Sequence, residues 1–274
     1  DANLCTTSET HVITEPILLT SSVDTSNFNG FGVHCNGDAD GWINLTVNDG
    51  VPNYSYSWTG STTSSLQNLS NLDAGTYNVT VTDANSCTTL ETVVITEPTS
   101  FVDVGGGATK STYSGGFNIS CNGYNDGTIT VQSSGGVAPY TYFEGVNPNS
   151  PSTSGVFSDL FFGTYNLSVR DANLCEVNWN NIILTEPTEL TSNISTSSNY
   201  NTFGVSCNGD DDGWIDLTVN GGVLSYNYSW TGPNGYTSSS QDINTLLAGT
   251  YNVTVTDANL CTTSETHVIT EPIL

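Results

Sequence analysis

Three short motifs recur in a fixed order along the whole chain, and this repetition limits the fold more than any other feature of the sequence. Cys-Asn-Gly begins at Cys35, Cys121 and Cys207. Asp-Ala-Asn begins at Asp1, Asp83, Asp171 and Asp257, and Thr-Glu-Pro begins at Thr14, Thr96, Thr185 and Thr270. Self-similarity of this kind is typical of tandem arrays in which each repeat is one structural unit.

The motifs also predict where each repeat begins and ends. We expect the end of one repeat at residues 1–16, three complete repeats at residues 17–98, 99–187 and 188–272, and the start of another at residues 273–274. Residues 1–18 are identical to residues 257–274, so three repeats form one higher-order repeat. Identity of this kind indicates recent duplication, and we expect the protein to continue beyond both ends of this sequence.

Within a repeat, apolar and polar residues alternate, as they do at positions 43–47 and 77–81. A period of two is the signal of a β-strand with one buried face, and no stretch has the helical period. About seven short strands per repeat, separated by turns rich in Asp and Gly, are typical of an immunoglobulin-like sandwich. We therefore predict an all-β chain, a tandem array of three immunoglobulin-like (PKD-like) β-sandwich domains that forms an elongated rod.

Two local features of each repeat fit such a sandwich. Tyr77 stands at the start of the predicted penultimate strand, and Tyr165 and Tyr251 repeat it. A tyrosine at this corner commonly donates a hydrogen bond to the backbone a few residues upstream. Thr-Glu-Pro should mark the end of the last strand, because proline has no N–H to continue a ladder.

Charge and composition exclude several classes of partner. The 27 acidic residues outnumber two basic ones, Lys110 and Arg170, for a net charge of -25. This charge repels phosphate backbones and anionic membrane surfaces, so we expect no nucleic-acid partner. No apolar run approaches the ~20 residues that span a bilayer, so we expect no membrane insertion. The seven cysteines and the absence of methionine fit an exported chain.

The ordered set of motifs resembles the SprB repeat. The set is CNG-x-x-DG, then Tyr-x-Tyr-x-Trp, then AGTYNVTVTDAN-x-C, then VITEP. SprB repeats form large mobile surface adhesins of gliding Flavobacterium-like bacteria. The resemblance therefore implies a cell-surface location, export by the type IX secretion system, and a role with the gliding machinery. The middle repeat departs from its neighbours, since Thr128 takes the place of Trp42 and Trp214.

Each repeat has one cysteine in Cys-Asn-Gly and another shortly after Asp-Ala-Asn. One pair per repeat predicts three intradomain disulfides, Cys35–Cys87, Cys121–Cys175 and Cys207–Cys261. Cys5 is then left over, with its partner in a preceding repeat. Reduced, buried thiols are the alternative.

The residues after each Cys-Asn-Gly cysteine resemble half of a calcium loop. Oxygen-bearing side chains alternate before a glycine at Asn36, Asp38 and Asp40, and again at Asn208, Asp210 and Asp212. This spacing suits Ca²⁺, although Val47 stands where a bidentate glutamate would close the loop. In the middle repeat Tyr124 replaces a carboxylate. A plain Asp-Gly turn is the alternative, and calcium is the single cofactor that we consider.

Aromatic residues offer one further candidate site. Tyr54, Tyr56 and Trp58 could form a sugar-stacking platform if their rings face outward, but a small sandwich needs such side chains in its core. Phe143 takes the place of Trp58 and Trp230 in the middle repeat. We therefore expect these rings to lie in the core, with exposed and coplanar rings as the sign of sugar binding.

The sequence offers little for catalysis. Its histidines are His11, His34 and His267, and none falls in the middle repeat. No nucleophile, base and orienting group recur together, so we predict no catalytic residue and no enzyme activity.

We predict an extracellular stalk segment of a giant cell-surface adhesin, which acts in surface attachment and gliding motility as a structural spacer. Its expected partners are the neighbouring repeats of the same chain and an external surface or polysaccharide. Two alternatives stay open. The repeats themselves could bind carbohydrate as lectin-like modules, or they could form an accessory array on a secreted polysaccharide hydrolase.

Overall fold

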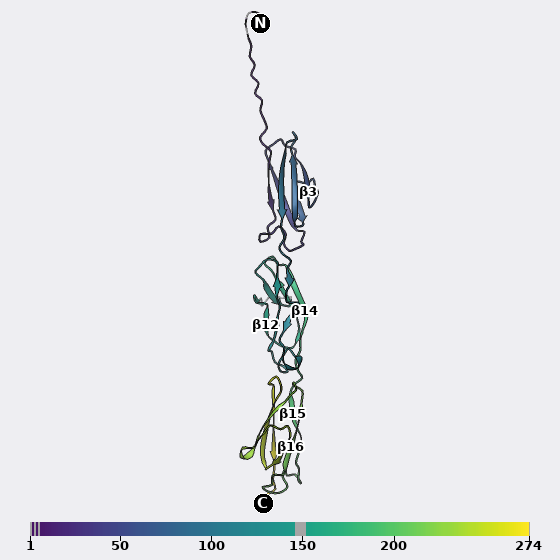
Figure 1. Cartoon of the computed structure of the whole chain (residues 1–274), viewed down its shortest axis with the longest axis vertical. Helices are drawn as coiled ribbons and strands as arrows, with labels where there is room; N and C mark the ends of the chain where they lie inside the picture. The colour runs from purple at the N-terminus through teal and green to yellow at the C-terminus, as the bar shows by residue number, and fades with distance from the viewer. Residues whose placement is uncertain (1, 3, 5, 146–151, 274) are drawn as a thin grey trace. The chain divides into compact units, whose positions relative to one another are not determined.

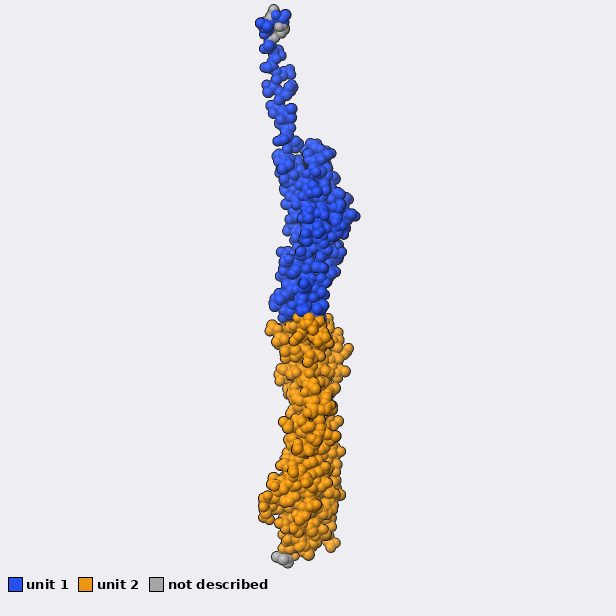
Figure 2. Space-filling view, viewed as in Figure 1, with its two compact units in different colours: residues 1–102, 134–140, 170–177 blue, residues 103–133, 141–169, 178–274 orange. Residues whose placement is uncertain are grey.

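A computed structural model describes residues 2, 4, 6–145 and 152–273, which are almost entirely strands, turns and loops (Figure 1). The chain divides into two compact units. The first holds residues 1–102, 134–140 and 170–177, and the second holds residues 103–133, 141–169 and 178–274 (Figure 2). The middle repeat thus contributes segments to both units, and the predicted borders of three separate domains stay a prediction.

The first repeat contains six strands. They are β1 (Thr20–Thr25), β2 (Gly41–Asn48), β3 (Ser55–Gly60), β4 (Leu69–Leu72), β5 (Gly75–Thr82) and β6 (Thr88–Ile95). One sheet has the order β1-β2-β4 and the other the order β3-β5-β6. All of the described pairings in these sheets are antiparallel. β5 and β6 pair along their full length, from Gly75 opposite Ile95 to Thr82 opposite Thr88.

Both sheets of the first repeat send side chains into one core. β2 and β5 alternate as predicted, with the apolar residues buried and the residues between them more exposed. Trp58 of β3 is 1% exposed, and its indole Nε1 donates a hydrogen bond to the carbonyl of Leu66. Tyr54 and Tyr56 pack partly buried against the same core. The repeat is therefore a two-layer β-sandwich.

The middle repeat is built from shorter strands. They are β7 (Val102–Asp103), β8 (Thr109–Lys110), β9 (Gly127–Thr130), β10 (Ser133–Ser134), β11 (Thr141–Glu144), β12 (Val156–Leu160), β13 (Gly163–Arg170) and β14 (Glu176–Leu184), with one 3₁₀ turn, η1 (Ser114–Gly116). Its three-stranded sheets have the orders β12-β9-β8 and β11-β13-β14, and β10 pairs with β7.

The third repeat closely matches the first. Its strands are β15 (Thr191–Ser197), β16 (Gly213–Asn220), β17 (Asn227–Thr231), β18 (Thr237–Ser238), β19 (Ile243–Leu246), β20 (Gly249–Thr256) and β21 (Thr262–Ile269), and a short η2 (Pro233–Gly235) precedes β18. The sheets have the orders β15-β16-β19 and β18-β17-β20-β21. Seven strands match the predicted number here. The first repeat has six, because the segment after β3 makes an isolated bridge from Trp58 to Ser64 instead of a strand.

The predicted tyrosine corner is confirmed in all three repeats. The hydroxyl of Tyr77 donates a hydrogen bond of 2.9 Å to the carbonyl of Asp73. Tyr165 and Tyr251 make the same bond to the carbonyl four residues upstream, also at 2.9 Å. Thr-Glu-Pro follows directly after the last strand of each repeat, as predicted. The all-β, immunoglobulin-like fold predicted from the sequence is therefore confirmed.

The core of the middle repeat differs from the prediction. Tyr142 is the buried residue of β11, and Phe143 lies half-buried on the next position of that strand. Because side chains alternate along a strand, Phe143 does not take the place of Trp58. Tyr142 holds that position, because its bridge to Ser152 matches the bridge from Trp58 to Ser64. Trp179 on β14 is also buried, and its Nε1 has no hydrogen-bond partner among the described atoms.

In the described part of the chain, no helical segment has the length and apolar character that a membrane crossing requires.

Candidate functional site at the repeat junctions

Each Cys-Asn-Gly segment forms a loop, called here the CNG loop, which is tied to the Thr-Glu-Pro end of its own repeat. In the first repeat, Asn36 Nδ2 donates to the carbonyl of Pro98 at 3.0 Å, and the Gly37 N–H donates to Glu97 Oε2 at 2.8 Å. The middle and third repeats make both bonds from Asn122, Gly123, Asn208 and Gly209. The CNG loop therefore lies at the end of the sandwich where β6 finishes.

Carboxylates inside the CNG loop accept hydrogen bonds from the loop itself. In the first repeat, Asp40 Oδ1 accepts from the His34 N–H at 3.1 Å, and Asp38 Oδ2 accepts from the Cys35 N–H at 3.0 Å. In the third repeat, Asp212 accepts from the Ser206 N–H at 3.0 Å, a bond that lowers the pKa of the Asp212 carboxyl.

These hydrogen bonds are the ones expected of a plain Asp-Gly turn, which was the alternative to a calcium loop. Among the described residues, no three Asp, Glu, His or Cys side chains gather closely enough to hold a metal ion. Asn36 and Asn208 each use their amide Nδ2 to bind a proline carbonyl, and Asp210 accepts from the Ser206 hydroxyl. Calcium binding by this loop stays a prediction.

The Asp-Ala-Asn segment forms a second loop, called here the DAN loop, which is organised by its aspartate. Asp83 accepts backbone hydrogen bonds from Val51 at 2.9 Å, from Asn85 at 2.9 Å and from Cys87 at 2.8 Å. The bond from Val51 contributes most to lowering the pKa of the Asp83 carboxyl. The middle and third repeats make the same three bonds at Asp171 and Asp257.

The two cysteines of one repeat lie at opposite ends of its sandwich. Cys87 directly precedes β6, whereas Cys35 lies in the CNG loop, beyond the other end of β6. The eight residues of β6 extend about 27 Å at ~3.4 Å per residue. A disulfide requires Cα atoms within about 7 Å, so a bond between Cys35 and Cys87 is impossible in this fold.

The predicted intradomain disulfides are therefore wrong. Instead, Cys35 is bonded to Cys175, and Cys121 is bonded to Cys261, each with a Cα–Cα distance of 5.8 Å. Each bond joins the CNG loop of one repeat to the DAN loop of the next, and each lies inside one compact unit. The predicted pairs Cys35–Cys87, Cys121–Cys175 and Cys207–Cys261 do not form. Cys87 and Cys207 are free and exposed, and Cys5 lies outside the described residues.

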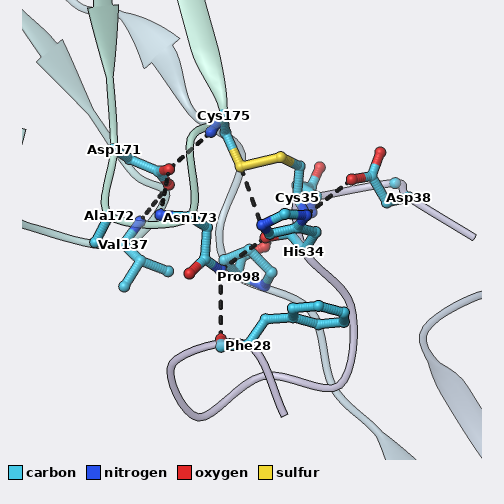
Figure 3. Close-up of a disulfide and its surroundings, with 12 residues drawn as sticks. Phe28, His34, Cys35, Asp38, Pro98, Val137, Asp171, Ala172, Asn173 and Cys175 are labelled. Atoms are coloured by element: carbon cyan, nitrogen blue, oxygen red, sulfur yellow. Dashed lines mark hydrogen bonds between the residues drawn. A yellow bond between two sulfur atoms is a disulfide. The ribbon is translucent and has the colours of Figure 1, made fainter. Parts of the chain in front are cut away.

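An asparagine side chain accompanies each of these disulfides, and Figure 3 shows Asn173 beside the bond between Cys35 and Cys175. Asn173 Nδ2 donates to the carbonyls of His34 at 2.8 Å and Phe28 at 3.3 Å, and Asn173 Oδ1 accepts from Asn29 Nδ2 at 2.5 Å. Asn173 is 3% exposed, so these bonds are shielded from water. We call this arrangement the asparagine clamp.

The second junction repeats the clamp with different partners. Asn259 Nδ2 donates to the carbonyls of Ser120 at 3.0 Å and Ser114 at 3.3 Å, and its Oδ1 accepts from the Ser114 N–H at 3.0 Å. Apart from the Asn29 side chain at the first junction, the partners of the clamp asparagines are backbone atoms, so the clamp depends little on the side chains of the preceding repeat. Two different sequences can therefore form the same junction.

The disulfides contribute the larger part of the junction's stability. Each closes a loop with a sequence separation of 140 residues. In the chain-entropy model a loop of this length stabilises the folded state by about 5 kcal/mol. A net hydrogen bond contributes about 1 kcal/mol, so the three bonds of the clamp add roughly 3 kcal/mol.

The aromatic residues do not form a sugar platform on β3. Trp58 and Trp230 are both buried, and the tyrosines before them lie partly buried against the core. Exposed aromatic side chains occur elsewhere, at Phe161 and Phe162 in the middle repeat. Phe162 borders an open hollow of about 590 Å³ that Asn122 and Ile183 also line.

The histidines do not assemble a catalytic group. Nδ1 of His34 lies 3.7 Å from the carboxylate of Asp40, and the ring of His34 stacks on Phe28 with centroids 4.7 Å apart. Burial on β21 lowers the pKa of His267. His11 lies next to Glu9 in the exposed segment before β1.

Three immunoglobulin-like sandwiches in series, with matching loops at their junctions, define a tandem-repeat module. A family model described as the SprB repeat matches residues 33–63, 118–143 and 199–235, one region in each repeat. These matches confirm, in every repeat, the resemblance to the SprB-repeat family that the motifs indicated. Its disulfides fit an extracellular or surface protein, since such bonds persist in oxidising compartments. No curated protein matches the chain.

Several solved structures resemble the chain at low identity. A C-terminal fragment of intimin, solved in complex with the intimin-binding domain of the translocated intimin receptor, is 15% identical. The match covers 69% of this chain and 72% of that one, with a TM-score of 0.37.

Two further structures contain tandem domains. Protocadherin gamma B7 extracellular cadherin domains 1–4 are 13% identical, with coverage of 83% and 70% and a TM-score of 0.30. A tetra-tandem repeat from the extending region of a large adhesion protein is 14% identical, with coverage of 92% and 74% and a TM-score of 0.25. Likeness at this level says nothing about function.

The sequence contained a signal for the true disulfide pairing. The DAN loop precedes the last strand of a repeat and Thr-Glu-Pro follows it, so these two motifs must lie at opposite ends of the sandwich. In a tandem array the chain enters each sandwich at one end and leaves it at the other. The first strand of a repeat therefore runs from the DAN-loop end to the Thr-Glu-Pro end. The CNG loop, which comes after that strand, then belongs beside Thr-Glu-Pro and the next repeat's DAN loop.

Proposed function

We propose that this chain is a repetitive stalk segment of a cell-surface adhesin, which holds adhesive parts away from the cell during surface attachment and gliding. The junctions carry the proposal. Each repeat described here is joined to the next by a short linker, an asparagine clamp and a disulfide. Such a joint suits a spacer that must keep its form under load.

A replacement experiment in the organism tests the spacer role. An in-frame deletion of the three repeats should reduce attachment and gliding, and an unrelated rigid β-sandwich array of the same length should restore both. If only SprB repeats restore them, the repeats act through their own surface and the spacer role is wrong. Retention of the protein inside cells that lack type IX secretion would support the proposed export route.

Carbohydrate binding by the repeats is the alternative function. The burial of Trp58 and Trp230 removes the platform that the sequence offered for it. The hollow beside Phe162 is where a sugar ring could still stack. A glycan array probed with the chain and with its Phe162→Ala variant tests this alternative, and we expect no glycan to distinguish the two proteins.

We also propose that the chain has no enzyme activity of its own. Asp40 and Asp212, the recurring carboxylates of the CNG loop, accept backbone hydrogen bonds that fix the loop. A glycan-hydrolysis screen should show no turnover. Turnover that disappears in an Asp40→Asn, Asp212→Asn double variant would contradict the proposal.

A further inference from the structure

Two halves of a junction are present in this chain without a partner. The first repeat has a DAN loop whose cysteine, Cys87, is free and exposed, and the third repeat has a CNG loop whose cysteine, Cys207, is also free and exposed. Their counterparts at the two formed junctions are disulfide-bonded. The chain therefore shows the same loops both with and without a docked repeat.

The open DAN loop already has the geometry of the docked ones. The Cys87 N–H donates to Asp83 Oδ1 at 2.8 Å, and the Cys175 N–H donates to Asp171 Oδ1 at 2.9 Å. In both loops the backbone N–H of the aspartate donates a hydrogen bond to the cysteine carbonyl, at 2.9 Å in the open loop and 3.1 Å in the docked one. Docking is therefore not needed to shape this loop.

The open CNG loop is preformed as well. Gly209 donates to Glu271 at 2.9 Å and Asn208 donates to the Pro272 carbonyl at 3.0 Å, as in the loops at the formed junctions. The carbonyl of Ser206 is equivalent to the carbonyls of His34 and Ser120, which accept hydrogen bonds from the clamp asparagines at the formed junctions. Within the described residues the Ser206 carbonyl accepts no hydrogen bond.

The asparagine of the open DAN loop is also without its partners. Asn85 is exposed, and its side chain makes no hydrogen bond within the part of the chain that the structure describes, whereas Asn173 in the docked loop makes three. A preorganised loop binds with less loss of conformational entropy than a mobile one. Both open loops are therefore ready to dock.

We propose that each open loop binds a further repeat of this family through the complementary loop, and that a disulfide at Cys87 or Cys207 then locks the joint. A small-molecule disulfide, such as oxidised glutathione, supplies the oxidising equivalents. The Cys207 thiolate attacks it and releases one thiol, and the thiolate of the docked DAN loop attacks the resulting mixed disulfide and releases the second. Two protein thiols become one disulfide, and one glutathione disulfide becomes two thiols.

A second copy of this chain is the probe, since it carries both complementary loops. All variants carry Cys5→Ser, so that Cys87 and Cys207 are the two cysteines compared. A Cys87→Ser chain then presents Cys207 alone, and a Cys207→Ser chain presents Cys87 alone. In a glutathione redox buffer, we expect the mixture to form a head-to-tail heterodimer at least about tenfold faster than either variant forms a homodimer. Mass spectrometry should identify a Cys207–Cys87 peptide.

Equal rates of homodimer and heterodimer formation would overturn the proposal, because they would mean that exposed thiols couple without docking. A second measurement tests the clamp. Asn85→Ala in the Cys207→Ser chain should slow heterodimer formation by at least about fivefold, since each net hydrogen bond of the clamp contributes a factor of about five. Asn44→Ala, on an exposed position of β2, is the matched control and should leave the rate unchanged. A slowing by both variants alike would contradict the assigned clamp.

The docking test depends on neither adhesion nor motility. Its failure would leave the stalk role to the replacement experiment, and failure of the stalk role would leave the joint intact.

Discussion

The DAN loops of the first and middle repeats have the same internal structure but different surroundings. In both loops one aspartate holds three backbone N–H groups, although the loop at Asp171 is docked and the loop at Asp83 is open. The difference lies in what crosses the junction. Asn173 and Cys175 bind the preceding repeat, and Asn85 and Cys87 bind nothing across a junction within the described residues.

This comparison separates two contributions to the joint. The local sequence builds the loop, and docking adds a disulfide and three hydrogen bonds to a structure that already exists. Changes inside the loop should therefore affect both repeats alike, whereas changes to the groups that cross the junction should affect only the docked loop.

The largest expected effect comes from the disulfide. A Cys35→Ser, Cys175→Ser double variant should lose about 5 kcal/mol of unfolding free energy, because a loop with a separation of 140 residues is released in the unfolded state. Cys87→Ser, the open counterpart, should change the unfolding free energy by less than about 0.5 kcal/mol. Guanidinium titration of the oxidised proteins measures both, and equal losses would show that the bond does not stabilise the joint.

The next effect comes from the aspartate inside the loop. Asp171→Ala leaves three N–H groups without an acceptor and should cost about 3 kcal/mol. Asp83→Ala should also lower the melting temperature of its repeat, since the same three bonds exist there. Thermal unfolding checks both variants. A loss confined to Asp171→Ala would mean that docking, and not the local sequence, builds the loop.

The asparagine clamp should have a smaller effect that is confined to the docked loop. Asn173→Ala removes three hydrogen bonds across the junction and should cost roughly 2 kcal/mol, because water replaces part of what is lost. Asn85→Ala should stay within about 0.5 kcal/mol of the unchanged protein. Urea titration distinguishes them, and similar costs for both would contradict the clamp.

Acid should weaken the open loop in a defined direction. The folded pKa of Asp83 is lowered, chiefly by the Val51 N–H, so its carboxylate stabilises the folded state above the ordinary pKa near 3.9. That contribution is lost as the pH falls through the lower folded pKa. The melting temperature of the first repeat should therefore drop more steeply below pH 4 in the unchanged protein than in Asp83→Asn. Parallel curves would contradict this assignment.

Calcium should have the smallest effect. The prediction from the sequence is a rise in melting temperature for the first and third repeats alone, because Tyr124 replaces a carboxylate in the middle one. Asp38 and Asp40 already accept hydrogen bonds from the loop, so we expect a rise of about 1 °C or less. Calorimetry with calcium and with chelator measures this rise. Equal melting temperatures under the two conditions, in every repeat, would leave the loop as a plain turn.

Local patterns in the sequence were enough to predict much of the fold. The alternation of apolar residues in β2 and β5, the corner at Tyr77 and the end of each last strand depend on neighbouring residues, and all were confirmed. The core of the middle repeat was harder to predict. The spacing around Phe143 suggested a replacement for Trp58, yet the neighbouring Tyr142 is the buried residue that makes the equivalent bridge.

The disulfide pairing at the repeat junctions was predicted wrongly for a different reason. Counting one pair of cysteines per repeat assumes that the two lie near each other, and it ignores the direction in which each strand runs. Cys35 and Cys87 recur once per repeat but lie a full strand apart. The partner of Cys35 was 140 residues away, in the next repeat. Periodicity in a sequence reports which residues are equivalent, and strand direction decides which of them meet.

The two disulfides enclose overlapping stretches of chain, since Cys121 lies inside the loop that Cys35 and Cys175 close. The shortest covalent route from Cys35 to Cys261 therefore crosses one disulfide, returns along residues 175–121, and crosses the other. Stretched fully at about 3.5 Å per residue, that route is roughly 190 Å long, against roughly 800 Å for the reduced backbone. An oxidised chain pulled at Cys35 and Cys261 thus reaches its greatest extension at about a quarter of the length that the reduced chain reaches between the same two residues, even when every strand has come apart.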